Sequence, residues 1–371
     1  MDENLLKEAM TTIRRFAQHR GNEQCKAIFD TIDALFPGPM QPLVIKVARN
    51  KDRASFTFII NLPPNVCYRD FKKRENYFED ASGGAVQIQK KGKAVFLRMM
   101  TEEIQREYPY IWDPAPYEQM HLPVPLGYSA LGLIVRDLAD GPNWISAGHP
   151  GSGKSNLLHV IAVSLLLSRP IYLVIIDLKK LEFSYLEKHA LLVDTMDGAR
   201  QVLVAINKQL DKRLDILKGV GAVKIQDYAG EMPWIVLVID ELAEMQDEQC
   251  QDSLNRIVRL GRAPGISVVA ATQRPSSTMF RKFGDSKAMF AGTVCYHVRD
   301  ETNSRMLLDN DRASLIPNIP GRGILQFDEE LEIQTMFLPV KRAKKLLQGI
   351  PPTKPKEVMM IEQPPKRLPA R

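Results

Sequence analysis

Residues 148–155 have the types and spacing needed to hold phosphate groups. Their sequence, GHPGSGKS, fits the pattern G-x-x-x-x-G-K-[S/T] at every specified position. Glycines let successive backbone N–H groups point inward at phosphate oxygens, and a helix that begins there adds the positive end of its dipole. We expect Lys154 to reach the β and γ phosphates of a nucleoside triphosphate and the Ser155 hydroxyl to be a ligand of Mg²⁺. The predicted nucleotide-binding residues are Gly148, Gly151, Ser152, Gly153, Lys154, Ser155 and Asp240, of which Ser155 and Asp240 are also the predicted metal ligands.

The flanks of this motif favour a phosphate-binding loop over a chance glycine-rich turn. An apolar run at residues 143–147 precedes the motif, and leucine, valine and isoleucine follow it at helical spacing over residues 157–161. The stretch therefore predicts a strand, a loop and a helix in that order, which is the context that the motif requires.

Two carboxylates form the second candidate group. Residues 234–239 are an unbroken apolar run that ends in Asp240 and Glu241. A buried central strand of a parallel sheet delivers such residues to the carboxyl edge of the sheet. We expect Asp240 to hold the Mg²⁺ shell and Glu241 to orient or deprotonate an attacking water. The alternative is that both acids only open the next helix, where negative charge is favourable.

Gln273 and Arg262 are further candidates for a hydrolytic reaction. Gln273 stands at the tip of the next predicted strand, in ATQRPS, where a polar side chain can sense the γ-phosphate or simply cap the strand. Arg262, in RLGRAPG, can stabilise transition-state charge in the site of a neighbouring subunit, or it can pair locally as an exposed arginine. With Glu241, these two are the predicted catalytic residues.

The composition is that of an ordinary globular protein with an excess of positive charge. Of 371 residues, 44% are hydrophobic and 25% are charged, and the formal net charge of +6 favours an anionic partner. The four cysteines have no C-x-x-C spacing, which argues against a zinc site or a disulfide framework and fits a reducing cytoplasm. The N-terminus lacks the features of a signal peptide and no window resembles a membrane span, so we expect a soluble cytoplasmic protein.

Periodicity divides the chain into segments of different character. Residues 1–41 are predicted to form a helical extension, and residues 42–119 a small α+β domain rich in basic residues. Residues 120–339 are predicted to form the main domain. Residues 340–371 are basic and proline-rich, and we expect them to be disordered.

The main domain alternates strand and helix patterns. This rhythm predicts an α/β fold with a parallel sheet that helices cover on both faces. A linker punctuated by Pro114, Pro116, Pro123 and Pro125 is expected before it. The expected strands lie near residues 143–147, 171–177, 234–240 and 266–271, and further strands near 290–298, 322–327 and 332–338.

Together the motifs resemble those of the FtsK/SpoIIIE family of DNA-pumping motors. GHPGSGKS, IDLK at residues 176–179, VIDELA at 238–243, RAPGI at 262–266 and ATQRPS at 271–276 stand in the order and approximate spacing of that family. The resemblance covers about residues 42–339. It implies a RecA-like P-loop ATPase domain behind a small α+β domain, assembled as a hexameric ring around double-stranded DNA, with ATP and Mg²⁺ as cofactors. It gives the roles named above to Lys154, Ser155, Asp240, Glu241, Gln273 and Arg262, with Arg305 as the second choice for the residue that acts in trans.

The resemblance also implies where DNA would lie. Lys224, in the loop 218–230, and Arg281 and Lys282, in the loop 274–287, follow elements that face the channel in such motors. Basic side chains at these positions would follow the phosphates without reading bases.

Chromosome-segregating members of this family carry a membrane-spanning N-terminus and a C-terminal winged helix, and the sequence has neither pattern. We therefore expect a motor of the mobile-element kind, such as a conjugative coupling protein, which partner proteins at the membrane or in the relaxosome recruit. Two alternatives remain: a protein-export ATPase like those of type VII secretion, and a nucleotide-switched DNA-binding or scaffold protein. The pairing of Glu241 with Asp240 argues against the switch, which would not need a base.

Overall fold

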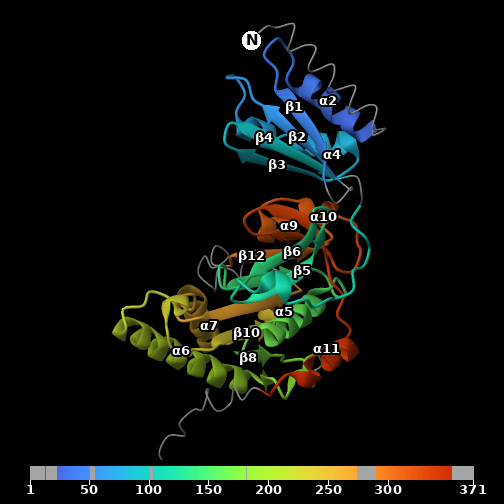
Figure 1. The fold of residues 1–371 in the computed structure, drawn as a ribbon. Coiled ribbons are helices and arrows are strands. Elements are labelled where there is room, and N and C mark those ends of the chain that lie inside the picture. The colour runs from blue at the N-terminus through green and yellow to red at the C-terminus, as the bar shows by residue number, and fades with distance from the viewer. Residues whose placement is uncertain are drawn as a thin grey trace, which may run out of the picture. The chain divides into compact units, whose positions relative to one another are not determined.

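The structure is a computed structural model that describes residues 13, 23–50, 55–100, 103–180, 182–273 and 290–352. The chain folds into two compact units, Met1–Ile104 and Gln105–Arg371, each with its own hydrophobic core. Figure 1 shows the elements of both units. Within the described residues, no helix combines the length and the apolar character needed to cross a bilayer.

The first unit is a four-stranded antiparallel sheet with helices on one face, in the strand order β1-β2-β4-β3. Alternate residues of the strands point to that face, so Phe58 of β2 and Leu97 of β4 are fully buried. Phe29 of α2 packs edge-on against Phe58, with 5.7 Å between ring centroids. The elements are α2 (Glu23–Leu35), β1 (Leu43–Arg49), β2 (Ser55–Asn61), α3 (Tyr68–Lys72), α4 (Glu75–Ser82), β3 (Val86–Lys91) and β4 (Ala94–Met100).

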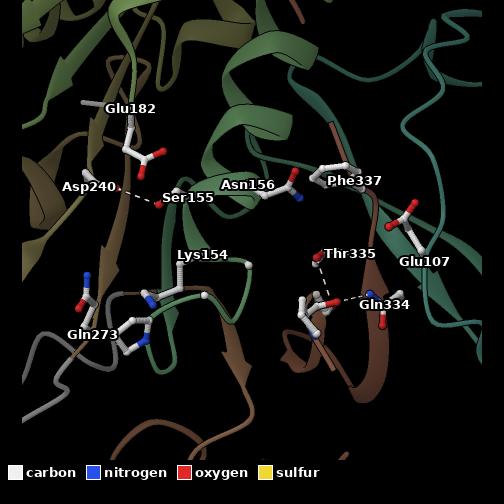
Figure 2. A pocket seen from close by; sticks show the side chains of 15 residues that line it. Glu107, Lys154, Ser155, Asn156, Glu182, Asp240, Gln273, Gln334, Thr335 and Phe337 are labelled. Atoms are coloured by element: carbon white, nitrogen blue, oxygen red, sulfur yellow. Dashed lines mark hydrogen bonds between the residues drawn. The ribbon is translucent and has the colours of Figure 1, made fainter. Parts of the chain in front are cut away.

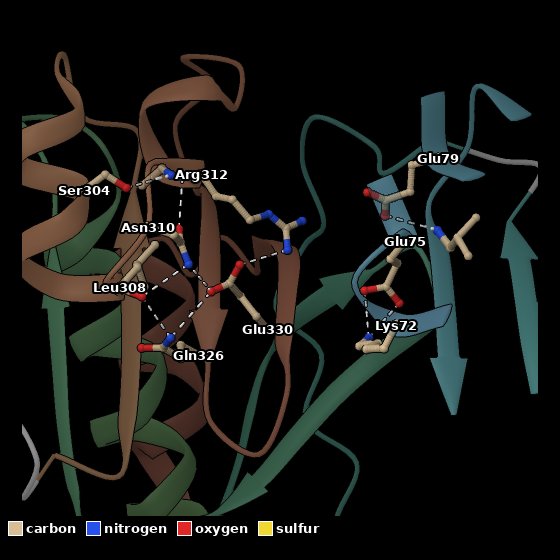
Figure 3. A network of polar contacts seen from close by, with 11 residues as sticks. Lys72, Glu75, Glu79, Ser304, Leu308, Asn310, Arg312, Gln326 and Glu330 are labelled. Atoms are coloured by element: carbon tan, nitrogen blue, oxygen red, sulfur yellow. Dashed lines mark hydrogen bonds and ion pairs between the residues drawn. The ribbon is translucent and has the colours of Figure 1, made fainter. Parts of the chain in front are cut away.

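Two carboxylates of α4 accept hydrogen bonds from backbone amides at one edge of this sheet. β3 is an edge strand, so the N–H groups of Val86 and Ile88 that point away from β4 need other partners. Glu79 accepts from the Val86 amide at 3.2 Å and Glu75 from the Ile88 amide at 2.9 Å. Lys72 donates to both oxygens of Glu75, at 2.6 and 2.7 Å (Figure 3). These two edge donors of β3 are therefore satisfied by side chains, not by another strand.

The second unit is built on a ten-stranded sheet in the order β6-β5-β14-β13-β12-β7-β11-β10-β8-β9. The strands from β12 to β9 are parallel, and β13, β14, β5 and β6 extend the sheet in antiparallel fashion. The strands are β5 (Pro123–Ser129), β6 (Gly132–Asp137), β7 (Asn143–Ala147), β8 (Ile171–Ile176), β9 (Ala190–Val193), β10 (Trp234–Ile239), β11 (Ile266–Thr272), β12 (Gly292–Tyr296), β13 (Arg322–Gln326) and β14 (Glu330–Thr335).

Helices cover both faces of the parallel strands, as the alternation of patterns predicted. Val236 and Val238 of β10 belong to the core that α5 shares, whereas Leu237 and Ile239 belong to the core of α6 and α7. The α-helices are α5 (Lys154–Ser168), α6 (Met196–Gly219), α7 (Glu248–Leu260), α9 (Glu301–Leu308), α10 (Arg312–Leu315) and α11 (Val340–Leu346), and the 3₁₀ helices are η1 (Ala115–Tyr117), η2 (Ser184–Leu186), η3 (Ile225–Asp227), η4 (Leu242–Glu244) and η6 (Leu347–Gly349).

Two sequence-based expectations differ from this fold. Pro123 and Pro125 were expected in a linker, but they lie in β5, which pairs with β14 only at Gly127 and Tyr128. The prolines thus occupy a stretch of strand with a partner on one side, where a missing N–H is tolerated. The disorder expected from residue 340 does not hold for α11, because Ala343 and Leu347 are buried in the core of the second unit. The rest of that tail, from residue 353, lies outside the described residues.

Candidate nucleotide-binding site

Parallel strands bring the candidate residues to one edge of the sheet. β11 lies between β7 and β10, and β10 lies between β11 and β8. At its carboxyl end, β7 leads into residues 148–155 and β11 into Gln273. In the same way, β10 leads into Asp240 and β8 into Asp177. Because the carboxyl ends of parallel strands meet at the same edge, residues far apart in sequence face one crevice.

The loop 148–155 adopts the curled path that its glycines allow. Gly153 has a φ of 116°, and a Cβ there would lie 3.0 Å from the Gly321 amide nitrogen. A Cβ on Gly148 would lie 2.6 Å from Ser152 Oγ and 2.8 Å from Tyr296 Cβ. The Gly321 amide donates to the Ser152 carbonyl at 2.8 Å, which ties the loop to the segment before β13. Side chains larger than hydrogen are therefore excluded at both glycines.

Lys154 is the first residue of α5 and is buried beneath the loop. Its ammonium donates to the carbonyl oxygens of Gly148 and His149 at 2.7 and 2.8 Å. Burial lowers the pKa of Lys154 to about 8, against the opposing effect of Glu241 and Asp240. A cation that is poorly solvated is ready to exchange loop carbonyls for phosphate oxygens.

Ser155, at the end of the loop, lies beside Asp240. The Ser155 hydroxyl donates to an Asp240 carboxylate oxygen at 3.5 Å. Burial, and next the negative charge of Asp177, raise the pKa of Asp240 to about 6. Across the described residues no group of three or more His, Cys, Asp or Glu side chains could hold a metal ion. A divalent cation at Ser155 and Asp240 would thus need phosphate oxygens and water to complete its shell.

Glu241 is buried and held on both sides. Both oxygens of its carboxylate accept from the backbone amide of Gln273, at 3.1 and 3.2 Å. The ammonium of Lys179 lies 3.6 Å from Glu241 Oε2. Glu241 thereby links β10 to the end of β11 and to the loop after β8.

A cavity of about 520 Å³ contains Lys154, Ser155, Asp240 and Gln273 in its lining. Figure 2 shows these side chains on one side of the cavity and Asn156, Phe337 and Glu107 on the other. Asn156 fixes this second wall, because its amide donates to the Met336 carbonyl at 2.7 Å and its Oδ1 accepts from the Leu338 amide at 2.9 Å. The cavity therefore runs from the phosphate loop to an exposed aromatic ring.

Other predicted site residues lie elsewhere or outside the described part of the chain. Arg262 is exposed in the turn before β11, at the amino edge of the parallel strands and away from the cavity. Lys224 lies beside that turn, because the Ile225 amide donates to the Ala263 carbonyl at 2.8 Å. Arg305 of α9 is exposed and pairs with Glu301 at 3.0 Å. Arg281 and Lys282 lie outside the described residues.

Sequence patterns missed several residues of the site. Asp177 stands at the end of an apolar strand, the same signal that identified Asp240, and its carboxylate accepts from the amides of Lys179, Lys180 and Glu182. The wall opposite the phosphate loop carries no motif. Its residues were not predictable because they come from β14, the segment after it and the segment before β5: Glu107, Gln334, Thr335 and Phe337.

The buried negative charge of Asp240 lowers the stability of the folded protein, and a substitution can measure this effect. The pKa of Asp240 lies above its ordinary value of 3.8, so the folded protein holds this proton more tightly than the unfolded chain. The carboxylate therefore lowers stability above pH 6, and this effect fades as the pH falls towards 4. We expect Asp240→Asn to raise the free energy of unfolding by about 1–3 kcal/mol at pH 7 and by much less at pH 4. Thermal melting in EDTA at both pH values measures the difference.

Asp194→Asn is the matched control, since Asp194 is exposed and pairs with Lys180 at the surface. It should leave melting nearly unchanged at either pH. A stabilisation by Asp240→Asn that is equal at both pH values would contradict the assignment to a buried charge.

Comparisons with known proteins agree with this geometry. Residues 112–235 match the model of the FtsK/SpoIIIE family. The DNA translocase FtsK of Chlamydia trachomatis is 32% identical over 234 residues, which are 56% of this chain and 29% of that protein. The DNA translocase SpoIIIE of Bacillus subtilis is 27% identical over 246 residues, 58% of this chain and 31% of its own length. The chain thus spans about a third or less of these relatives.

Solved structures share the fold. The pCW3 conjugation coupling protein TcpA, in a monomer form with ATPγS, superposes with a TM-score of 0.62 at 22% identity, covering 88% of this chain and 98% of that one. The cytoplasmic domain of the type VII secretion ATPase EccC of Thermomonospora curvata has a TM-score of 0.57 at 21% identity, with 69% and 34% covered. Both are P-loop ATPases with a mixed α/β sheet of this kind. The resemblance seen in the motifs is therefore confirmed over residues 112–235, which match the FtsK/SpoIIIE family model, and the solved structures share the α/β fold.

Proposed function

We propose that the protein is an ATP-driven translocase of double-stranded DNA that works as a ring of identical subunits. The observation that carries the proposal is the convergence of Lys154, Ser155, Asp240 and Gln273 on one cavity, with Glu241 hydrogen-bonded to the backbone of Gln273. A nucleotide-binding protein without a motor function would not need a carboxylate such as Glu241 that is hydrogen-bonded to the end of β11, where the following loop begins. The similarity to DNA translocases supports duplex DNA as the substrate.

The phosphate loop would bind the triphosphate and Lys154 would neutralise it. On binding, the Lys154 ammonium leaves the carbonyls of Gly148 and His149 for the β and γ phosphates. Ser155 and Asp240 fit a Mg²⁺ ion, which would neutralise charge that develops on the phosphates during hydrolysis. The nucleoside would extend along the cavity towards Phe337, where an exposed ring is available for stacking.

Glu241 would act as the general base. Water attacks the γ phosphorus, its proton passes to the Glu241 carboxylate, and the bond from the γ phosphorus to the bridging oxygen breaks. For this the carboxylate must be released from, or shared with, the Gln273 amide that it binds at 3.1 and 3.2 Å. Loss of the γ-phosphate would thus change the contacts of Gln273 and of the loop that follows β11, which is how hydrolysis would reach the DNA.

Arg262 would act in the site of a neighbouring subunit. Its place at the amino edge of β11 separates it from the cavity of its own chain by the length of that strand. The loop of Lys224, a proposed DNA contact, is hydrogen-bonded to the same turn at Ala263. A DNA contact at Lys224 would therefore influence the position of Arg262 through this hydrogen bond. Such an arrangement suits a ring in which each subunit completes the site of the next.

A role in DNA transfer by a mobile or conjugative element is the finer part of the proposal. The coupling protein TcpA matches this chain over nearly its full length, which supports that role. Recruitment to a membrane or a relaxosome by a partner protein belongs to the same proposal.

The experiment that tests this function is steady-state ATP hydrolysis with and without long linear duplex DNA. We expect duplex DNA to raise the rate about 10-fold or more, and the stimulation to weaken as salt rises, because basic side chains that contact phosphates release counterions. The EDTA-treated sample is the matched control and should hydrolyse no ATP. A rate that is indifferent to DNA would overturn the translocase and favour a protein-export ATPase or a nucleotide-controlled switch.

A further inference from the structure

The open face of the sheet in the first unit presents side chains in two rows. Cross-strand pairing aligns Lys46, Ile59, Phe96 and Gln89 in one row. The second row contains Ala48, Thr57, Arg98 and Gln87. The opposite face carries the core residues that pack against α2 and α4. These outward side chains are therefore a surface and not part of the core.

The strands that form this surface carry charge of one sign. The four strands contain basic residues and no aspartate or glutamate. Lys46, Lys91 and Arg98 point outward, and the Lys91 ammonium lies 5.2 Å from the centroid of the Phe96 ring. An anionic partner is the one that such a surface attracts.

The surface is also hollowed and its polar groups are oriented. A depression of about 500 Å³ is lined by residues of this face and one beside it: Asn50, Thr57, Gln87, Gln89, Lys91, Phe96 and Arg98. Asn50 donates to Ser55 Oγ at 2.8 Å and to Thr57 Oγ1 at 3.0 Å. The Arg98 Nε–H donates to the same Ser55 oxygen at 3.1 Å. This hydrogen bond orients the guanidinium, which is part of the lining of the depression.

We propose that this face, formed by Lys46, Thr57, Gln89, Lys91, Phe96 and Arg98, binds single-stranded nucleic acid. One unpaired base stacks on Phe96, the amides of Gln87 and Gln89 reach base edges, and the cations bind the flanking phosphates. Lys91 is exposed on a flexible stem, so its ammonium can leave the ring for a phosphate when a base takes its place.

The exposed side of the Phe96 ring favours single-stranded nucleic acid over a duplex as the ligand of this face. Bases within a duplex are already stacked on each other, and a duplex would offer this face only its phosphates. A ring within a basic sheet face adds stacking energy only when a free base can lie on it. The site is separate from the nucleotide cavity, which lies wholly in the second unit. The inference therefore stands whether or not the motor proposal is correct.

The test is binding of a fluorescein-labelled 15-nucleotide oligothymidylate to the full chain, followed by fluorescence anisotropy. We expect Phe96→Leu to weaken binding about 5- to 50-fold, from the loss of base stacking. Lys46→Gln and Lys91→Gln should each reduce the slope of log affinity against log salt by about 0.7. Phe96→Trp should keep the affinity, and its added tryptophan fluorescence should be quenched by the bound base. An oligouridylate of the same length tests whether RNA binds as well.

Lys26→Gln is the matched control, because Lys26 is exposed on α2, on the other side of the unit. It should leave the affinity unchanged, and thermal melting verifies the fold of each variant. Absence of binding, an equal loss in Lys26→Gln, or full affinity in Phe96→Leu would each overturn the proposal. Duplex-stimulated hydrolysis is measured on the same variants; it should be unchanged by Phe96→Leu, and its absence in every variant would refute the motor and not this site.

Discussion

Lys154→Ala is expected to abolish nucleotide binding at millimolar ATP and with it all hydrolysis. The ammonium is the cation at the centre of the loop, where it holds the carbonyls of Gly148 and His149 at 2.7 and 2.8 Å. Alanine removes both this contact and the charge that would neutralise the phosphates. We expect affinity for a fluorescent ATP analogue to fall about 100-fold or more, with a similar loss of steady-state hydrolysis.

The same substitution should not unfold the protein. Burial lowers the pKa of Lys154 to about 8, so at neutral pH the folded state carries a charge that is costly to bury. Removing it offsets part of the loss of hydrogen bonds, and melting without nucleotide should change little. Lys188→Ala, at an exposed turn position, is the control and should bind nucleotide normally. Tight nucleotide binding by Lys154→Ala would refute the assignment of this loop.

Glu241→Gln is expected to separate binding from hydrolysis. The amide oxygen of glutamine can still accept from the Gln273 backbone, so the link between β10 and β11 survives. The amide cannot accept a proton from water at neutral pH. We therefore expect nucleotide affinity within about threefold of the wild type and a hydrolysis rate reduced by about 10²- to 10⁴-fold. Single-turnover hydrolysis of radiolabelled ATP measures the chemical step directly.

Glu244→Gln is the control for this experiment. Glu244 is the last residue of the short helix η4, which Glu241 caps, but it is exposed, whereas Glu241 is buried. Its rate should match the wild type. If Glu241→Gln hydrolysed ATP at the normal rate, the general base would have to be sought elsewhere, and Glu182, which lines the cavity, would be the next carboxylate to test.

The residues on the phosphate-binding side of the cavity could be predicted from the sequence because the patterns that identify them are local. A strand, a loop and a helix in the right order predicted where Lys154 and Ser155 would lie, and apolar runs ending in polar residues predicted Asp240 and Gln273. Parallel pairing then brings these ends together without further information. The observed strands β7, β8, β10 and β11 begin and end within a residue or so of the predicted ranges.

The other wall of the cavity could not be predicted in this way. Phe337 and Glu107 are placed by long-range contacts: the Phe337 amide donates to the Tyr108 carbonyl, and the Tyr110 amide to the Phe337 carbonyl. No spacing in the sequence encodes such a pairing. The strand β5 was missed because proline is a strong local signal for a break, whereas this part of the sheet, with a partner strand on one side only, tolerates it.

The hydrogen bonds from β3 to Glu75 and Glu79 limit how the sheet of the first unit can pair with strands of other molecules. Polymerisation by strand addition needs two open edges on each molecule, one to receive and one to offer. Glu75 and Glu79 occupy the outward amides of Ile88 and Val86 in the first half of β3, which leaves β1 as the other edge of the sheet. A sheet with one of its edges partly blocked in this way can pair with a second copy through β1, but it is less able to grow into a fibre. Crowding of many copies around one substrate would thus carry less risk of amyloid-like assembly through this unit.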